Sequence, residues 1–212
     1  MNTKGSLAVV IFLILLVITV ISIIAIQKYK QSKSYFTYRG LYGDYYIQQL
    51  LVENTTLYRI NTDVGNRKYI ITLRNSPYDV ENITMEPQPE KAINRKGEML
   101  YITKDPEIIN ATVNKATIAI IEFGRILGTN EYGIYQIPTK SANTKFPENN
   151  LNSTTPVITC DNVTDQISVI YVKLGNKNEI YTKSNCLVME ATDGDNLLKV
   201  ADKFAYHLLG FF

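Results

Sequence analysis

Hydrophobic and polar positions divide the chain into an apolar N-terminal stretch and a longer part of mixed pattern. Residues 6–26 carry no charge, and their only polar side chains are Ser6, Thr19 and Ser22. At ~1.5 Å per helical residue this stretch is ~30 Å long, which matches the hydrocarbon core of a bilayer. We therefore predict a transmembrane helix at 6–26 behind a cytoplasmic head at 1–5, because a buried core helix would be shorter and apolar on one side.

The same stretch fits an uncleaved signal-anchor better than a cleaved signal peptide. A signal peptide has an apolar core of roughly 7 to 15 residues, followed by a small-x-small cleavage site. The exit of this stretch, Ile23 to Gln27, lacks that pair of small residues. The predicted span is therefore retained in the mature chain.

Beyond a predicted juxtamembrane stalk at 27–44, the pattern changes to the period-two alternation of strands. We expect a strand-rich part at 45–90 and an α+β part at 98–212, with the boundary in the proline-containing segment 86–98. The turn sequence at 63–68 predicts an antiparallel hairpin between the strands that flank it. The strands expected are 45–53, 56–61, 68–75, 80–86, 98–103, 132–138, 156–160, 166–174, 179–183 and 186–191.

The tyrosines and lysines of the stalk allow two interpretations. They fit an interfacial belt on lipid headgroups, or a polar linker that runs into a first strand whose tyrosines pack on the domain. Gly40 and Gly43 would break a long amphipathic helix, so the second interpretation is favoured.

Apolar spacings of three and four predict two helices in the α+β part. The first begins at Asp105-Pro106, because Asp accepts from the free amides of a helix start and Pro has no amide to lose; it ends at Gly128. The second covers 196–209, with Asp195 as its cap. The predicted fold class is α+β, an N-terminal transmembrane helix followed by a mixed β-sheet domain with one buried and one C-terminal covering helix.

Charge and composition narrow the partner classes. The chain has 22 Lys and Arg against 20 Asp and Glu, a formal charge of +2, and these residues are scattered rather than gathered in a stripe. A nucleic-acid partner is therefore not expected. With 45% hydrophobic residues the chain has enough apolar surface to form a folded core.

Two signals disagree about the side of the membrane that the domain occupies. Lys28, Lys30 and Lys33 follow the apolar stretch, and positive-inside counting places the domain in the cytoplasm. Paired cysteines and five N-glycosylation sequons favour the outside, although chance alone supplies about 2.5 sequons. The predicted localisation is the cell membrane, single-pass, with the C-terminal domain outside. The sequons lie at Asn54, Asn82, Asn110, Asn152 and Asn162.

Cys160 and Cys186 are the only cysteines, and they lie at the end of one predicted strand and the start of another. A disulfide across a loop of this length would stabilise the fold by about 3.5 kcal/mol. Two buried free thiols, or a metal or nucleophilic role, remain open alternatives. Zinc, however, requires paired ligands at short spacing, and here each cysteine stands alone.

Other candidate groups fit structural roles better than chemical ones. His207, the only histidine, fits a structural position on the last helix better than a general base. Asp193 and Asp195 could bind calcium with Asp161 or Asp165, but they lack the alternation of a calcium loop and fit a turn and helix cap. No phosphate-binding, nucleophile-elbow or dinucleotide-binding motif occurs, so we expect no catalytic, metal or cofactor site.

Several short motifs in the second half carry a resemblance. They are Lys104-Asp105-Pro106, Phe123 to Gly128, Ile137-Pro138-Thr139, Thr159-Cys160-Asp161, Asn185-Cys186, Ala201-Asp202 and Leu208-Leu209-Gly210. Their order resembles uncharacterised archaeal proteins with one N-terminal membrane helix. That resemblance implies an anchored extracytoplasmic domain with a C-terminal Cys pair, and it brings no activity with it.

The N-terminal residues also look like an archaeal pilin leader, with Lys4-Gly5 before a long apolar helix. Pilins usually have Glu five residues after the cleavage point, where this chain has Val10. The function expected from the sequence is thus a membrane-anchored extracytoplasmic domain that binds a protein or cell-envelope component without catalysis. The alternatives are an anchored enzyme with an unrecognised site, a pilin-like subunit and a cytoplasm-facing accessory subunit; the oligomeric state is not predicted.

Overall fold

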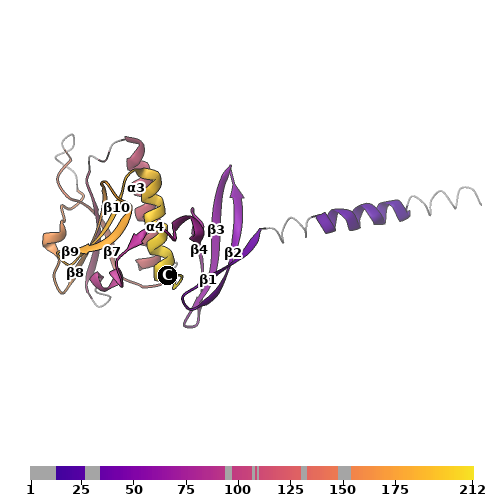
Figure 1. The fold of residues 1–212 in the computed structure, drawn as a ribbon, viewed down its shortest axis with the longest axis horizontal. Coiled ribbons are helices and arrows are strands. Elements are labelled where there is room, and N and C mark those ends of the chain that lie inside the picture. The colour runs from indigo at the N-terminus through magenta and orange to yellow at the C-terminus, as the bar shows by residue number, and fades with distance from the viewer. Residues whose placement is uncertain are drawn as a thin grey trace, which may run out of the picture.

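A computed structural model describes residues 13–26, 34–93, 97–106, 108, 110–129, 133–147 and 154–212 of the chain. Residues 13–26 form a helix with exposed side chains, which stands apart from the folded body in Figure 1. Its two hydroxyls, of Thr19 and Ser22, donate to carbonyl oxygens one turn back, at 2.7 and 2.8 Å.

The prediction of a transmembrane helix at 6–26 is wrong. Among the described residues, no helix is both long and apolar enough to cross a membrane. Residues 13–26 are the described part of the predicted span. The predicted localisation, a single-pass membrane protein with its domain outside, depended on this helix and is corrected with it. The predicted head at 1–5 lies outside the described residues, as do 6–12 and 27–33.

The first sheet is an antiparallel meander of four strands in chain order. The predicted hairpin is confirmed, since β3 and β4 pair from Tyr58↔Leu73 to Val64↔Arg67 around Gly65. Part of the predicted stalk is in fact the edge strand β1, which pairs with β2. The strands are β1 (Tyr35–Gly40), β2 (Gly43–Val52), β3 (Thr55–Val64) and β4 (Arg67–Leu73).

The second sheet has six strands in the order β5-β9-β10-β8-β6-β7. Strands β10, β8, β6 and the edge strand β7 run parallel, and β9 runs antiparallel to β10. The sequence placed a strand at 132–138, but the structure places it at 139–143. The strands are β5 (Thr84–Met85), β6 (Met99–Lys104), β7 (Thr139–Asn143), β8 (Ile167–Leu174), β9 (Glu179–Lys183) and β10 (Cys186–Ala191).

The helices of the folded body differ in their starts from the sequence prediction. Within the described residues, α3 begins at Asn110 rather than at Asp105, and α4 is capped by Asp193, whose side chain accepts from the Asn196 amide at 2.8 Å. Asp195, the predicted cap, instead pairs with Lys115. The helices are α2 (Pro77–Val80), α3 (Asn110–Leu127) and α4 (Gly194–Leu208), with 3-10 turns η1 (Pro89–Ala92) and η2 (Cys160–Asn162).

Helix α4 lies between the two sheets, with α3 beside it (Figure 1). Its residues Leu197, Val200 and Phe204 are buried in the core that α3 and the six-stranded sheet share. Ala205 and Tyr206 are buried in a second core, against the four-stranded sheet. The fold is therefore α+β with two sheets and a central helix layer. The predicted single mixed sheet with a covering C-terminal helix is wrong, because α4 is buried from both sides.

The C-terminal residues fasten the four-stranded sheet to α4. Phe211 stacks on Tyr45, with ring centroids 3.8 Å apart, and on Tyr38 at 5.7 Å. The Tyr45 hydroxyl donates to the Gly210 carbonyl at 3.0 Å. Gly40 allows this close approach, since a Cβ there would meet the Phe211 backbone at 3.0 Å. The turn after α4 is therefore part of the contact between the layers.

The two candidate caps of α4 give the first prediction. Asp193→Ala should lower the free energy of unfolding by about 1 kcal/mol, because the Asn196 amide loses its acceptor. Asp195→Ala is the matched control, and it should cost less than about 0.5 kcal/mol, because its ion pair with Lys115 is exposed. Urea denaturation followed by circular dichroism measures both. Equal losses, or a larger loss in Asp195→Ala, would show that the cap is assigned wrongly.

Candidate functional site

The candidate site lies on the face of the six-stranded sheet that points away from the helices. A cavity of about 320 Å³ opens there over β8, β9 and β10. Its lining residues come from these strands and from the segments at 144, 159–161 and 184. They are Thr144, Thr159, Cys160, Asp161, Tyr171, Lys173, Tyr181, Lys183, Ser184 and Val188.

The floor of the cavity is a row of side chains that the strand register sets side by side. Val188 of β10 pairs with Tyr171 of β8 on one side and with Tyr181 of β9 on the other. Side chains two residues apart along a strand share a face, so Lys173 and Lys183 lie on the same side as these tyrosines. The cavity floor is thus Val188 between Tyr171 and Tyr181. Lys173 lies two residues after Tyr171 on β8, and Lys183 lies two residues after Tyr181 on β9.

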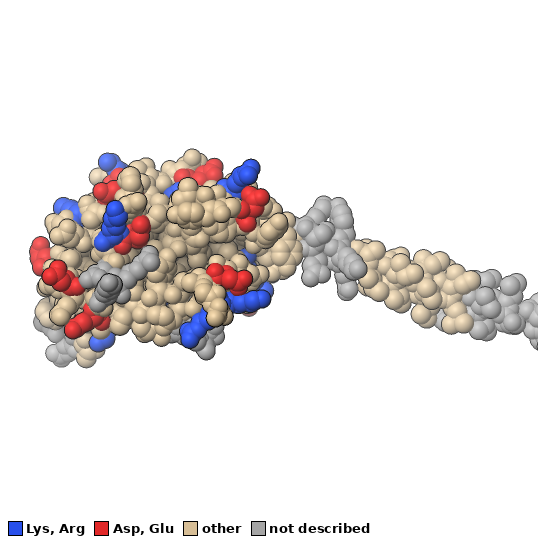
Figure 2. Space-filling model, turned by 90° about the horizontal axis from the view of Figure 1, so that it is seen from below, with Lys and Arg blue, Asp and Glu red and all other residues tan. Residues whose placement is uncertain are grey.

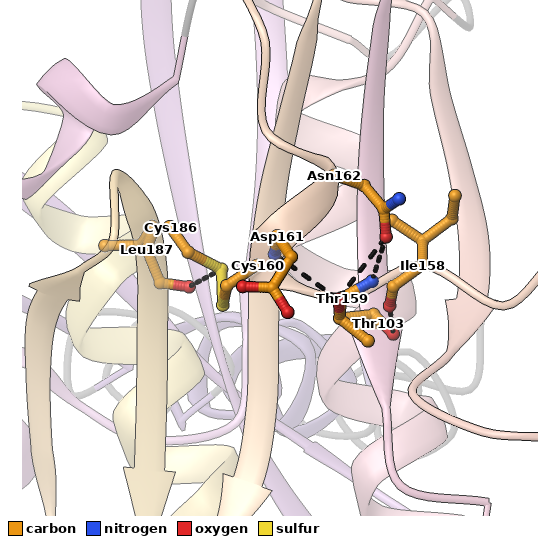
Figure 3. The surroundings of a disulfide bond; sticks show 8 residues. All are labelled: Thr103, Ile158, Thr159, Cys160, Asp161, Asn162, Cys186 and Leu187. Atoms are coloured by element: carbon orange, nitrogen blue, oxygen red, sulfur yellow. Dashed lines mark hydrogen bonds between the residues drawn. A yellow bond between two sulfur atoms is a disulfide. The ribbon is translucent and has the colours of Figure 1, made fainter.

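A disulfide closes one end of the cavity. Cys160 and Cys186 form the predicted bond, with Cα atoms 5.2 Å apart and a sequence separation of 26 (Figure 3). Cys186 is fully buried at the start of β10, whereas Cys160 is partly exposed in the turn η2. The disulfide prediction is confirmed, although Cys160 lies in a 3-10 turn and not at the end of a strand.

The turn that carries Cys160 is itself held in place. The Asn162 side chain accepts from the Thr159 amide at 2.8 Å, and the Thr159 hydroxyl accepts from the Asp161 amide at 3.3 Å (Figure 3). Just before it, the Thr103 hydroxyl donates to the Ile158 carbonyl at 2.7 Å and ties the segment to β6. The wall of the cavity is therefore preformed.

Glu190 organises the polar groups beside the floor. Its carboxylate, in a residue only 8% exposed, accepts from the Tyr181 hydroxyl and the Asn176 amide, both at 3.0 Å, and pairs with the Lys173 ammonium at 2.7 Å. Gly175 leaves the room for it, because a Cβ there would collide with the carboxylate. A buried carboxylate with three donors is stabilised in its ionised form.

These contacts fix the protonation states of the cavity. The hydrogen bond from Lys173 lowers the pKa of Glu190, and the same bond raises the pKa of Lys173. Burial raises the pKa of the Tyr171 and Tyr181 hydroxyls above 10. At neutral pH, Lys173 is a cation, Glu190 an anion and both phenols are neutral. None of these four groups is poised to exchange a proton near pH 7, which general acid-base catalysis requires.

Two donors in the cavity are available to a ligand. Within the described part of the chain, the Tyr171 hydroxyl makes no hydrogen bond and the exposed Lys183 ammonium makes no ion pair. Asp161, in the lining of the same cavity, is an exposed carboxylate. Elsewhere on the surface, Lys, Arg, Asp and Glu are intermixed over the face that Figure 2 shows.

The other residues singled out from the sequence do not gather into a site. His207 lies at the end of α4, with its Nε2 2.6 Å from a Glu90 carboxylate oxygen and its Nδ1 3.1 Å from the Phe212 carbonyl oxygen. Asp193 is a helix cap. Among the described residues, no group of three or more His, Cys, Asp or Glu side chains could hold a metal ion.

Glycosylation of the sequons stays a prediction. Asn54 is exposed in the β2–β3 turn with a positive φ of 67°, and Asn82 is exposed after α2. Asn162 is exposed in η2, and Asn110 is the first residue of α3. Asn152 lies outside the described residues.

Sequence reasoning missed the cavity, although a signal for it was present. Ile-Tyr-x-Lys occurs twice, at Ile170 to Lys173 and at Ile180 to Lys183, once in each strand that flanks β10. Comparison of the chain with protein families, with curated protein sequences and with solved structures found no match. The site therefore has to be interpreted from its own geometry.

The disulfide gives the second prediction. The double variant Cys160→Ala/Cys186→Ala should lose about 3.5 kcal/mol of unfolding free energy, since a loop of this length is closed by the bond. Urea denaturation of the oxidised protein and of the variant measures the difference. Alkylation of the denatured, unreduced protein should label neither cysteine, and labelling of both would contradict the bond.

Proposed function

We propose that the chain is a non-catalytic binding domain, and that its site is the cavity over Tyr171, Val188 and Tyr181. The observation that carries the proposal is the row of two tyrosines and a valine with a lysine at each side. Tyrosines supply contact area at low entropic cost, and a cationic donor fixes the orientation of a partner.

The ligand chemistry that fits is an acidic side chain on a protein partner. The free donors are the Tyr171 hydroxyl and the Lys183 ammonium, and the lining holds one exposed acceptor, the Asp161 carboxylate. A volume of about 320 Å³ is at the lower end of small-molecule sites, so the cavity suits one or two side chains rather than a cofactor. Lys173 is neutralised by Glu190, which leaves Lys183 as the cation that a carboxylate would meet.

The protonation states support binding over chemistry. The two cysteines, which could have supplied a nucleophile, are joined to each other. The one histidine lies at the C-terminal end of α4 and is not part of the cavity lining. An enzyme with an unrecognised site has no comparable support in the described residues.

A peptide titration tests the proposal. The full chain, labelled with ¹⁵N, is titrated with a blocked hexaglutamate peptide and, separately, with a blocked hexaglutamine peptide. Hexaglutamate should shift the amide signals of β8, β9 and η2, and hexaglutamine should bind at least about tenfold more weakly, because it lacks the charge. Equal binding of the two peptides, or shifts confined to other elements, would contradict the proposal.

Two charge-reversal variants test whether hexaglutamate binds in the cavity or to the protein surface in general. Lys183→Glu should weaken hexaglutamate binding by about tenfold or more, since an attraction becomes a repulsion. Lys177→Glu makes the same change of charge in the β8–β9 turn, outside the cavity lining, and should weaken binding less than about twofold at physiological salt. Similar losses in both variants would indicate non-specific attraction to the surface.

A further inference from the structure

A buried polar cluster joins the four-stranded sheet to the helix layer. Asp202 of α4 is fully buried, and one of its oxygens, Oδ2, accepts three hydrogen bonds from the chain that leaves β4. The donors are the Arg74 amide at 3.2 Å, the Asn75 amide at 2.8 Å and the Asn75 side-chain amide at 2.8 Å. One turn later, the Tyr206 hydroxyl donates to the Asn75 carbonyl at 2.9 Å.

Helix α3 brings a second carboxylate to the same cluster. Glu122 pairs with the Arg74 guanidinium at 2.7 Å through Oε1. Among the described residues, its other oxygen, Oε2, and the second oxygen of Asp202, Oδ1, are both buried without a hydrogen-bond partner. An ionised carboxylate in such a position is costly, because a buried charge needs donors to replace water.

The two carboxylates differ in what stabilises their charge. Burial raises the pKa of Glu122, but the Arg74 guanidinium in contact with it and the positive charge of Arg125 oppose this rise. Glu122 also lines a cavity of about 80 Å³ that can admit water. Asp202 has only neutral amides, and the negative charge of Glu122 opposes its own. Burial, followed by Glu122, raises the pKa of Asp202 to about 7.

The remaining charged and titratable groups around the cluster do not supply a counter-ion for Asp202. On α4, Lys203 donates to the Glu81 carbonyl and covers the Phe212 ring, and Tyr206 has a strongly raised pKa owing to burial. From β3 and α2, Tyr58 and Asp79 act on Tyr206 and would only add negative charge if ionised. A proton is thus the remaining way to neutralise Asp202.

We propose that Asp202 is a proton-operated lock between the two layers, closed by a proton on Oδ1 and loosened when Asp202 and Glu122 are both ionised. The proton is taken up from solvent and released to it, so no other reactant is needed. In the closed state Oδ2 holds residues 74 and 75 against α4. In the ionised state the repulsion between the carboxylates favours local opening of this contact, and so of the four-stranded sheet from the helix layer.

The sign of the pH dependence follows from the two states of Asp202. In an opened state the carboxyl meets water and has its ordinary pKa of 3.8, whereas in the closed state the pKa is about 7. The closed state therefore binds the proton more tightly, and its stability falls as pH rises from about 4 to about 7 and is constant above. Between pH 5 and pH 8 the opening constant should rise about a hundredfold.

Hydrogen exchange of the Arg74 and Asn75 amides in the full chain tests the lock directly, since both donate to Asp202. After correction for intrinsic exchange, their opening constants should rise about a hundredfold from pH 5 to pH 8. The Asn196 amide is an internal control. It donates to Asp193, whose pKa is lowered by that bond, so its opening should not change in this range.

Variants separate the lock from a purely structural role. In Asp202→Asn the amide oxygen can keep the three acceptor bonds while the NH2 group replaces the proton. Amides 74 and 75 should therefore remain protected at pH 8, with less than about a threefold change between the two pH values. Asp195→Asn, the same substitution at an exposed position of α4, should keep the hundredfold rise.

Two results would overturn the lock. One is a wild-type rise below about threefold, and the other is a hundredfold rise that persists in Asp202→Asn. Glu122→Gln tests the role of Glu122. Without its charge the opening constant of amides 74 and 75 should stop rising at a lower pH. If the opening constant levels off at the same pH as in the wild type, Glu122 is not part of the lock.

Discussion

The burial of α4 from both sides is the constraint on which the rest of the structure depends. One side of the helix completes the core of the six-stranded sheet, and the other side supplies Ala205 and Tyr206 to the core under the four-stranded sheet. Residues 200–206 of this helix are all buried, so each polar residue among them needs a partner inside the protein. Tyr206 and Lys203 reach backbone carbonyls, and Asp202 reaches backbone amides.

The strand β10 connects this central helix to the candidate site. All six of its residues are buried, with alternate side chains facing the helices and the cavity, and the chain passes from it through Asp193 directly into α4. Val188 on the cavity floor and Asp202 in α4 therefore belong to one continuous strand-helix unit. They lie on opposite sides of the six-stranded sheet. The disulfide at Cys186 anchors the far end of the same unit to the turn η2.

The sequence predicted features that depend on local pattern. It did not predict features that depend on how distant segments of the chain pack together. Alternation located most strands, and the turn chemistry around Gly65 located the β3–β4 hairpin. The capping signal at Asp105 was misleading, because α3 starts only at Asn110 in the described residues. No local pattern indicates that a C-terminal helix lies between two sheets, because its buried stripe fits a covering helix equally well. The cavity was missed for the same reason: the two Ile-Tyr-x-Lys segments become neighbours of Val188 only through the strand order.

Glu190 in the cavity and Asp202 between the layers differ in whether their charge is balanced. They therefore respond differently to pH. In the cavity, the ionised Glu190 meets an ammonium, a phenol and an amide, so its charge is balanced and the pKa values of its neighbours lie far from neutrality. Between the four-stranded sheet and the helix layer, Asp202 meets only neutral donors and a second carboxylate, so its charge is not balanced. A change of pH around neutrality therefore acts on the contact between the layers, while the charge of the Glu190–Lys173–Tyr181 network on the cavity floor is unchanged.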